Sequence, residues 1–77
     1  MTAKSFERTL RAFQRRTPFR AFMVELVSGS TLQVDHPEAL VFRGGTAVHF
    51  AKDGTPTLFD NEGVAKVTDA ILERRVS

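Results

Sequence analysis

The chain has 77 residues, of which 42% are hydrophobic and 26% charged, and its formal net charge is +2. This balance excludes a disordered chain, and the apolar runs are too short for a membrane-spanning helix. The charge is uneven. Residues 1–20 hold six basic residues and one acidic residue, a net charge of +5. Residues 21–77 hold five basic and eight acidic residues, a net charge of −3.

The size of the chain predicts a single domain over residues 1–77 with one small core. The first residues lack the apolar segment of a secretory signal, and there is no cysteine for a disulfide framework. We therefore expect a cytoplasmic protein with no membrane contact. A chain this short buries only about 60% of the surface that its unfolded form exposes, so self-association through an exposed strand edge is expected to add stability.

The first element is a helix over residues 4–16. Its apolar residues Phe6, Leu10 and Phe13 recur at intervals of four and three, which places them on one face. Four basic residues lie on the opposite face: Lys4, Arg8, Arg11 and Arg15. The helix ends before Pro18, because the residue preceding a proline is driven out of the helical region.

From residue 19 the apolar period changes to two, and residues 19–68 read as short antiparallel strands. Glycine-containing turns at Ser28–Ser30, Arg43–Gly45 and Lys52–Gly54 separate them, and Pro37 interrupts the pattern after the second. The strands are expected at residues 21–27, 31–34, 39–42, 47–51 and 55–59. Residues 60–63 form a turn or a single 3₁₀ turn.

The end of the chain is ambiguous. Val64, Val67 and Ile71 fit a helix, whereas the β-branched residues after Gly63 fit a closing strand over residues 64–67, which we favour. Residues 69–77 are expected to be a frayed or partly helical tail. The predicted fold is mainly β: an N-terminal helix followed by a five- or six-stranded antiparallel barrel of the SH3-like or Sm-like kind.

The predicted core follows from these periods. It comprises Phe6, Leu10, Phe13, Phe22, Val24, Leu26, Leu32, Val34, Leu40 or Val41, Val48, Phe50 and Phe59.

The order of elements, with Leu26-Val-Ser-Gly-Ser-Thr-Leu-Gln33 in the first hairpin and a one-turn break before the last strand, resembles the Sm-like fold of bacterial RNA chaperones. The resemblance covers most of the chain and implies the fold. The uridine-binding Tyr-Lys-His signature of that family falls on Phe59-Asp60-Asn61, so the family's nucleotide pocket is not implied. The segment Thr17–Phe22, with Asp35–Glu38, also resembles short bacterial proteins of uncharacterised function.

The basic helix is the main functional lead. Like charges three and four residues apart destabilise an isolated helix by about 0.2 to 0.5 kcal/mol per pair, and a bound anion would offset this cost. That anion is either a nucleic-acid phosphate or an acidic protein partner, while a simply solvated face is the third interpretation. The candidate binding residues are Lys4, Arg8, Arg11, Arg15, Arg16 and Arg20.

Catalytic and metal-binding patterns do not emerge from the sequence. His36 and His49 are thirteen residues apart without the short spacing of metal ligands, and Ser28 and Ser30 lie in a hairpin turn rather than in the setting of an activated serine. We expect a non-catalytic binding module without a cofactor or metal. The alternative is a protein-interaction or regulatory subunit.

Overall fold

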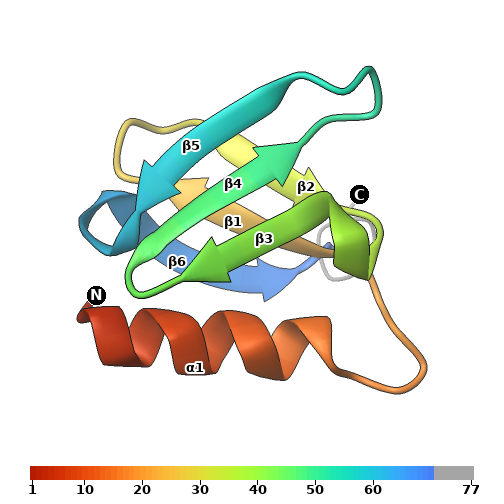
Figure 1. Ribbon diagram of the computed structural model, residues 1–77, viewed down its shortest axis with the longest axis horizontal. Helices are drawn as coiled ribbons and strands as arrows, with labels where there is room; N and C mark the ends of the chain where they lie inside the picture. The colour runs from red at the N-terminus through yellow and green to blue at the C-terminus, as the bar shows by residue number, and fades with distance from the viewer. Residues whose placement is uncertain (71–77) are drawn as a thin grey trace.

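The computed structural model describes residues 1–70, which form one helix, six strands and two 3₁₀ turns (Figure 1). In chain order these are α1 (Ala3–Gln14), β1 (Phe22–Leu26), β2 (Thr31–Val34), η1 (Pro37–Ala39), β3 (Leu40–Arg43), β4 (Thr46–Phe50), β5 (Pro56–Asp60), η2 (Asn61–Gly63) and β6 (Val64–Asp69). The mainly β fold with one N-terminal helix is confirmed.

Helix α1 begins at an N-cap, where the Thr2 Oγ1 accepts a hydrogen bond from the Ser5 N–H at 3.1 Å. It ends at Gln14, two residues before the predicted end at 16. Arg15 is the C-cap, and its N–H still donates to the Arg11 carbonyl oxygen at 3.0 Å. At Arg15 the backbone has φ −94° and ψ 5°, so it leaves the helical region two residues before Thr17, the residue that Pro18 restricts.

The strands pair into two antiparallel three-stranded sheets with the orders β2-β1-β6 and β3-β4-β5. The strand interpretation of residues 64–67 is confirmed by β6, which pairs with β1. The predicted tail begins too early, because Asp69 belongs to β6 opposite Phe22 and the Ala70 N–H donates to the Ala21 carbonyl oxygen at 3.3 Å. The expected helical character of residues 71–77 lies outside the described residues.

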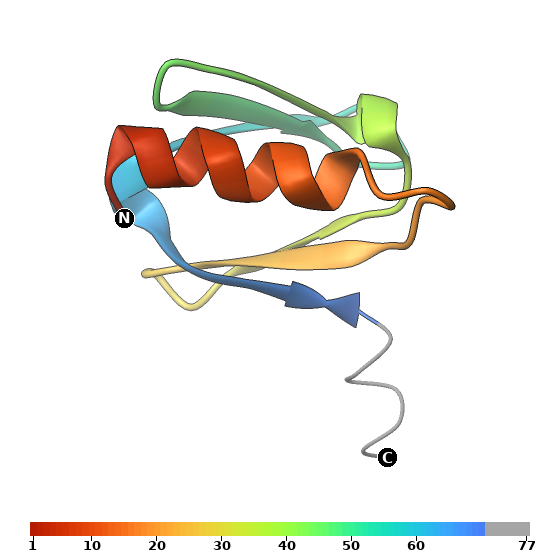
Figure 2. The same cartoon turned by 90° about the horizontal axis from the view of Figure 1, so that it is seen from below.

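No closed barrel is found over residues 1–70, since the hydrogen-bonded ladders stop at two separate sheets. Helix α1 lies along the open side between the sheets, as the view from below shows (Figure 2). Both of its ends are held. The Gln14 Nε2 donates to the carbonyl oxygens of Pro37 and Leu40 at 2.8 Å each, and the Asn61 Nδ2 donates to the Met1 carbonyl oxygen at 2.8 Å.

The start of the helix also approaches the β3–β4 turn closely. A Cβ added at Gly45 would lie 2.8 Å from the Asn61 Oδ1 and 3.2 Å from the Ala3 Cβ, so only glycine fits this position without displacing its neighbours. The preceding Gly44 has a φ of +68°, which favours glycine for a conformational reason instead.

Most of the predicted core is confirmed. Seven of its members are buried and pack in one cluster between the helix and the sheets: Phe6, Leu10, Phe22, Val24, Val34, Leu40 and Phe59. Three others, Phe13, Leu26 and Leu32, are partly buried at the margin of that cluster. The prediction left open whether Leu40 or Val41 is in the core; Leu40 is buried, whereas Val41 is 57% exposed.

The face of strand β4 that packs against the core is the opposite of the predicted one. The prediction buried Val48 and Phe50, but Ala47 and His49 face the core and Phe50 is 41% exposed. Directly paired residues share a face, and the β3–β4 register places Phe42 opposite Ala47 and Leu40 opposite His49. The inward face of β4 therefore places the small Ala47 between Phe42 of β3 and Phe59 of β5.

Candidate basic surface of helix α1

The exposed face of α1 presents a row of basic side chains. It is the face opposite Phe6 and Leu10, which are fully buried. A shallow groove of about 420 Å³ follows this face and is lined by Lys4, Glu7, Arg8, Arg11, Ala12 and Arg15. The structure thus brings four of the six candidate residues together on one surface, which we call the basic surface: Lys4, Arg8, Arg11 and Arg15.

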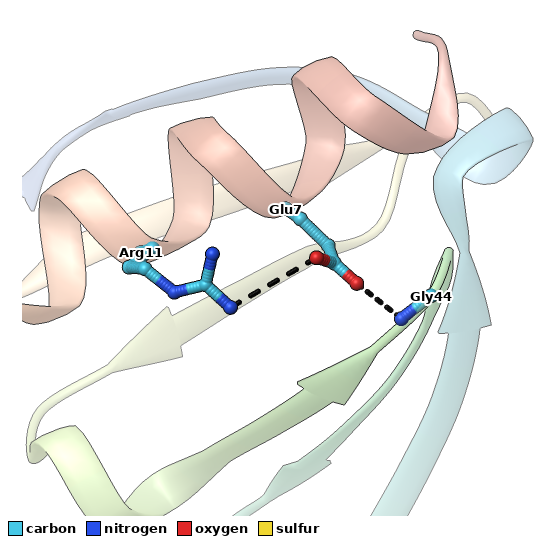
Figure 3. A network of polar contacts seen from close by, with 3 residues as sticks. All are labelled: Glu7, Arg11 and Gly44. Atoms are coloured by element: carbon cyan, nitrogen blue, oxygen red, sulfur yellow. Dashed lines mark hydrogen bonds and ion pairs between the residues drawn. The ribbon is translucent and has the colours of Figure 1, made fainter.

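Glu7, the acidic residue of α1, points towards the β3–β4 turn and lies between Arg11 and Gly44 (Figure 3). Its Oε2 accepts a hydrogen bond from the backbone N–H of Gly44, in the turn between β3 and β4. Its Oε1 lies 3.9 Å from the Arg11 Nη2, a long contact between partly exposed groups that is worth little. The carboxylate therefore fastens the helix to the β3–β4 turn, and it forms no ion pair with Lys4, Arg8 or Arg15.

Arg11 is only partly available to a partner. Besides its contact with Glu7, its guanidinium carbon lies 5.6 Å from the centre of the Phe42 ring, within the range of a cation–π interaction. Its side chain is nevertheless 47% exposed. We regard Arg11 as the edge of the basic surface, between the helix and β3.

Arg16 has a structural role in this fold. Its side chain is 20% exposed, and its Nη1 lies 2.5 Å from the Asp69 Oδ1 at the end of β6. The guanidinium carbon lies 4.7 Å from the centre of the Phe13 ring, and the Nη2 donates to the Arg20 carbonyl oxygen at 3.0 Å. Arg16 thereby joins the end of the helix to β6, and it does not share the exposed face of the other cations.

Arg20 lies on the segment between α1 and β1, away from the helical row. Its side chain is exposed, and its carbonyl oxygen is the acceptor for Arg16. Of the six candidates, the structure therefore places two outside the basic surface. Arg16 stands beyond the C-cap Arg15, so the helical period of the sequence does not place it.

The arrangement suits an extended anion. Lys4 and Arg15 are eleven residues apart, which corresponds to about 16 Å along a helix axis. Arginine binds phosphate through paired N–H donors, and lysine binds it as a point charge. A single compact anion would meet only one or two of these side chains, whereas a chain of phosphates can meet all of them.

A second hollow, of about 730 Å³, lies beside β2, η1 and β4 but has mixed charge. Its lining includes Asp35, Glu38, His36 and Lys52. Over residues 1–70, no three or more His, Asp or Glu side chains gather in a way that could hold a metal ion. This hollow therefore lacks the uniform charge that distinguishes the basic surface.

The described part of the chain contains no helix with the length and apolar character that crossing a membrane requires. Comparison with models of protein families, with curated proteins and with solved structures finds no match for this chain.

Proposed function

We propose that the chain is a non-catalytic, cytoplasmic binding module whose basic surface contacts the phosphates of single-stranded nucleic acid. The observation that supports this most directly is the position of Glu7. Its carboxylate accepts the Gly44 N–H, and three cations on the same exposed face form no ion pair among the described residues: Lys4, Arg8 and Arg15. Contacts of this kind bind with little sequence preference.

Salt dependence tests the proposal. Each phosphate neutralised on a single strand contributes about −0.7 to the slope of log affinity against log salt concentration. Three or four contacts per chain therefore correspond to a slope of about −2 to −3. Fluorescence anisotropy with a labelled thymidine oligonucleotide measures this slope directly.

A matched pair of variants separates the basic surface from net charge. The variant Arg8→Gln/Arg15→Gln should reduce the steepness of the slope by about 1.4, because two phosphate contacts are lost. The control Lys52→Gln/Lys66→Gln removes the same charge from exposed positions in the β4–β5 turn and on β6 and should leave the slope unchanged. Equal effects of the two variants would mean that net charge alone drives binding. Absence of binding at low salt would refute the nucleic-acid proposal and leave an acidic protein partner or a simply solvated face as the interpretations of this surface.

We also propose that the two sheets form an open version of the SH3-like or Sm-like barrel. The support is the order of elements: β2 and β3 follow each other through η1 as halves of one bent strand, and η2 stands directly before β6. An experimental structure in which β2 and β3 do not follow each other through η1 as one bent strand would refute this assignment.

A further inference from the structure

The outer face of the β3-β4-β5 sheet exposes large apolar side chains that no described element covers, and Figure 1 looks directly onto this face. Leu58 is 70% exposed, Val41 57% and Phe50 41%. Val41 pairs with Val48, and Val48 pairs with Leu58, so these three form one straight row across the three strands. Exposed apolar side chains gathered on one face mark interaction surfaces more often than isolated ones do.

The neighbouring row of outward residues on the same three strands ends in a charged residue on each side. Arg43 of β3 pairs with Thr46 of β4, and Thr46 pairs with Asp60 of β5. Both charged residues are exposed, and no ion pair joins them within residues 1–70. Two strand spacings, about 10 Å, separate them. Beyond the apolar row, on the other side, Phe50 pairs with Pro56.

From this pattern we propose that a second copy of the chain packs face to face on the outer β3-β4-β5 surface. The two-fold axis is parallel to β4 and lies midway between the β3-β4-β5 sheets of the two copies. Such an axis brings β3 of one copy over β5 of the other and keeps each row opposite the same row. Arg43 then faces the partner's Asp60, Val41 faces the partner's Leu58, and Val48 and Phe50 meet their own counterparts at the axis.

Charge complementarity selects this arrangement. A two-fold axis across the strands would instead place the Arg43–Thr46–Asp60 row over the row that contains Phe50 and Pro56, and it would desolvate both charges without a partner. The axis along β4 forms two ion pairs at the rim and one continuous apolar centre, the usual anatomy of a protein interface. Aligned sheets packed about 10 Å apart are also the standard geometry of a β-sandwich.

The surface is separate from the basic surface, because α1 lies along the open side between the sheets and not over this face (Figure 2). It also differs from the strand-edge pairing that the sequence suggests. A face of three strands and three rows is small, about 14 Å by 17 Å, so we expect a weak dimer at the lower end of interface sizes.

Complementary charge variants test the pairing. In sedimentation velocity over roughly 10 µM to 1 mM, the parent chain should shift from its mass of 8.6 kDa towards twice that value as concentration rises. Val41→Lys and Leu58→Glu, each at an exposed outward position, should each stay at the mass of one chain. When the two variants are mixed, the new lysine faces the new glutamate across the interface, and a dimer of one copy of each should reappear.

The control is Ala65→Glu. Ala65 is exposed on β6, in the other sheet, and its variant should dimerise like the parent. Circular dichroism of each variant verifies that it is folded. A parent that keeps the mass of one chain up to about 1 mM overturns the proposal. Mixing that restores no dimer overturns it as well, because only pairing of β3 with the partner's β5 brings the two new charges together. These measurements contain no nucleic acid, so their outcome is independent of the proposed function.

Discussion

The imidazole of His49 on β4 hydrogen-bonds to the main chain of the other sheet: its Nε2 lies 2.8 Å from the carbonyl oxygen of Gln33 on β2. A carbonyl oxygen only accepts, so the Nε2 carries the proton and donates. Hydrogen-bonded and non-hydrogen-bonded residue pairs alternate along an antiparallel ladder. The Leu26 N–H donates to the Ser30 carbonyl oxygen, so Met23 and Gln33, three positions further along the ladder, are a non-hydrogen-bonded pair. The Gln33 carbonyl therefore points away from β1. His49 therefore satisfies an edge carbonyl that has no ladder partner there, and it joins two sheets that share no ladder.

We predict that His49→Ala lowers the free energy of unfolding by about 2 to 4 kcal/mol, since it removes a buried ring and leaves an edge carbonyl unpaired. Urea denaturation measures the loss, and His36→Ala, at an exposed position, is the control and should change little. Long-range ¹H–¹⁵N NMR should find the proton on Nε2. A proton on Nδ1 would contradict the bond to Gln33.

The second prediction concerns how the helix is docked. Phe6 is fully buried and packs edge-on against Phe59, with ring centres 6.0 Å apart. Phe13 is only partly buried, and its ring contacts the Phe22 ring and the Arg16 guanidinium. Phe6→Ala should cost about 3 to 5 kcal/mol, and Phe13→Ala should cost less. Because small domains possess about 5 to 15 kcal/mol in total, the Phe6 variant should be close to unfolded. Equal losses in thermal denaturation would show that the two ends of the helix are buried alike.

The third prediction separates stability from binding. Arg16→Gln should lower the free energy of unfolding by about 1 to 2 kcal/mol, because it removes the ion pair with Asp69 and the cation–π contact with Phe13, both of them partly solvated. The salt slope for oligonucleotide binding should stay at the parent value. A flattened slope in a folded Arg16 variant would place this residue in the binding surface after all.

The fourth prediction is a titration. The pKa of Asp53 is lowered from its ordinary value of 3.8, chiefly by the hydrogen bond that its Oδ1 accepts from the Thr55 N–H at 3.0 Å. A pKa that is lower in the folded state stabilises the fold above the unfolded pKa, and this contribution is lost as the pH falls through the folded pKa. Carboxyl NMR should therefore show a midpoint below 3.8 for Asp53. A midpoint at or above that value would mean that the β4–β5 turn does not hold this hydrogen bond in solution.

Local patterns determined much of this protein. The spacing of Phe6, Leu10 and Phe13 determined the helix and its orientation, because neighbours on a helical surface recur every three or four residues. The alternation in residues 22–26 likewise placed Phe22 and Val24 in the core. The basic row on α1 follows from the same local period, so four of the six candidate binding residues share one surface as predicted.

Long-range pairing decided the rest. In β4 both alternating sets contain apolar residues, so the sequence pattern alone favoured burying the larger pair, Val48 and Phe50. The inward face was instead set by the register with β3 and β5, which depends on residues distant in the chain. For the same reason, only the tertiary structure shows that Glu7 binds the β3–β4 turn and that Arg16 binds β6: a charged side chain's partner is chosen by what the fold brings within reach.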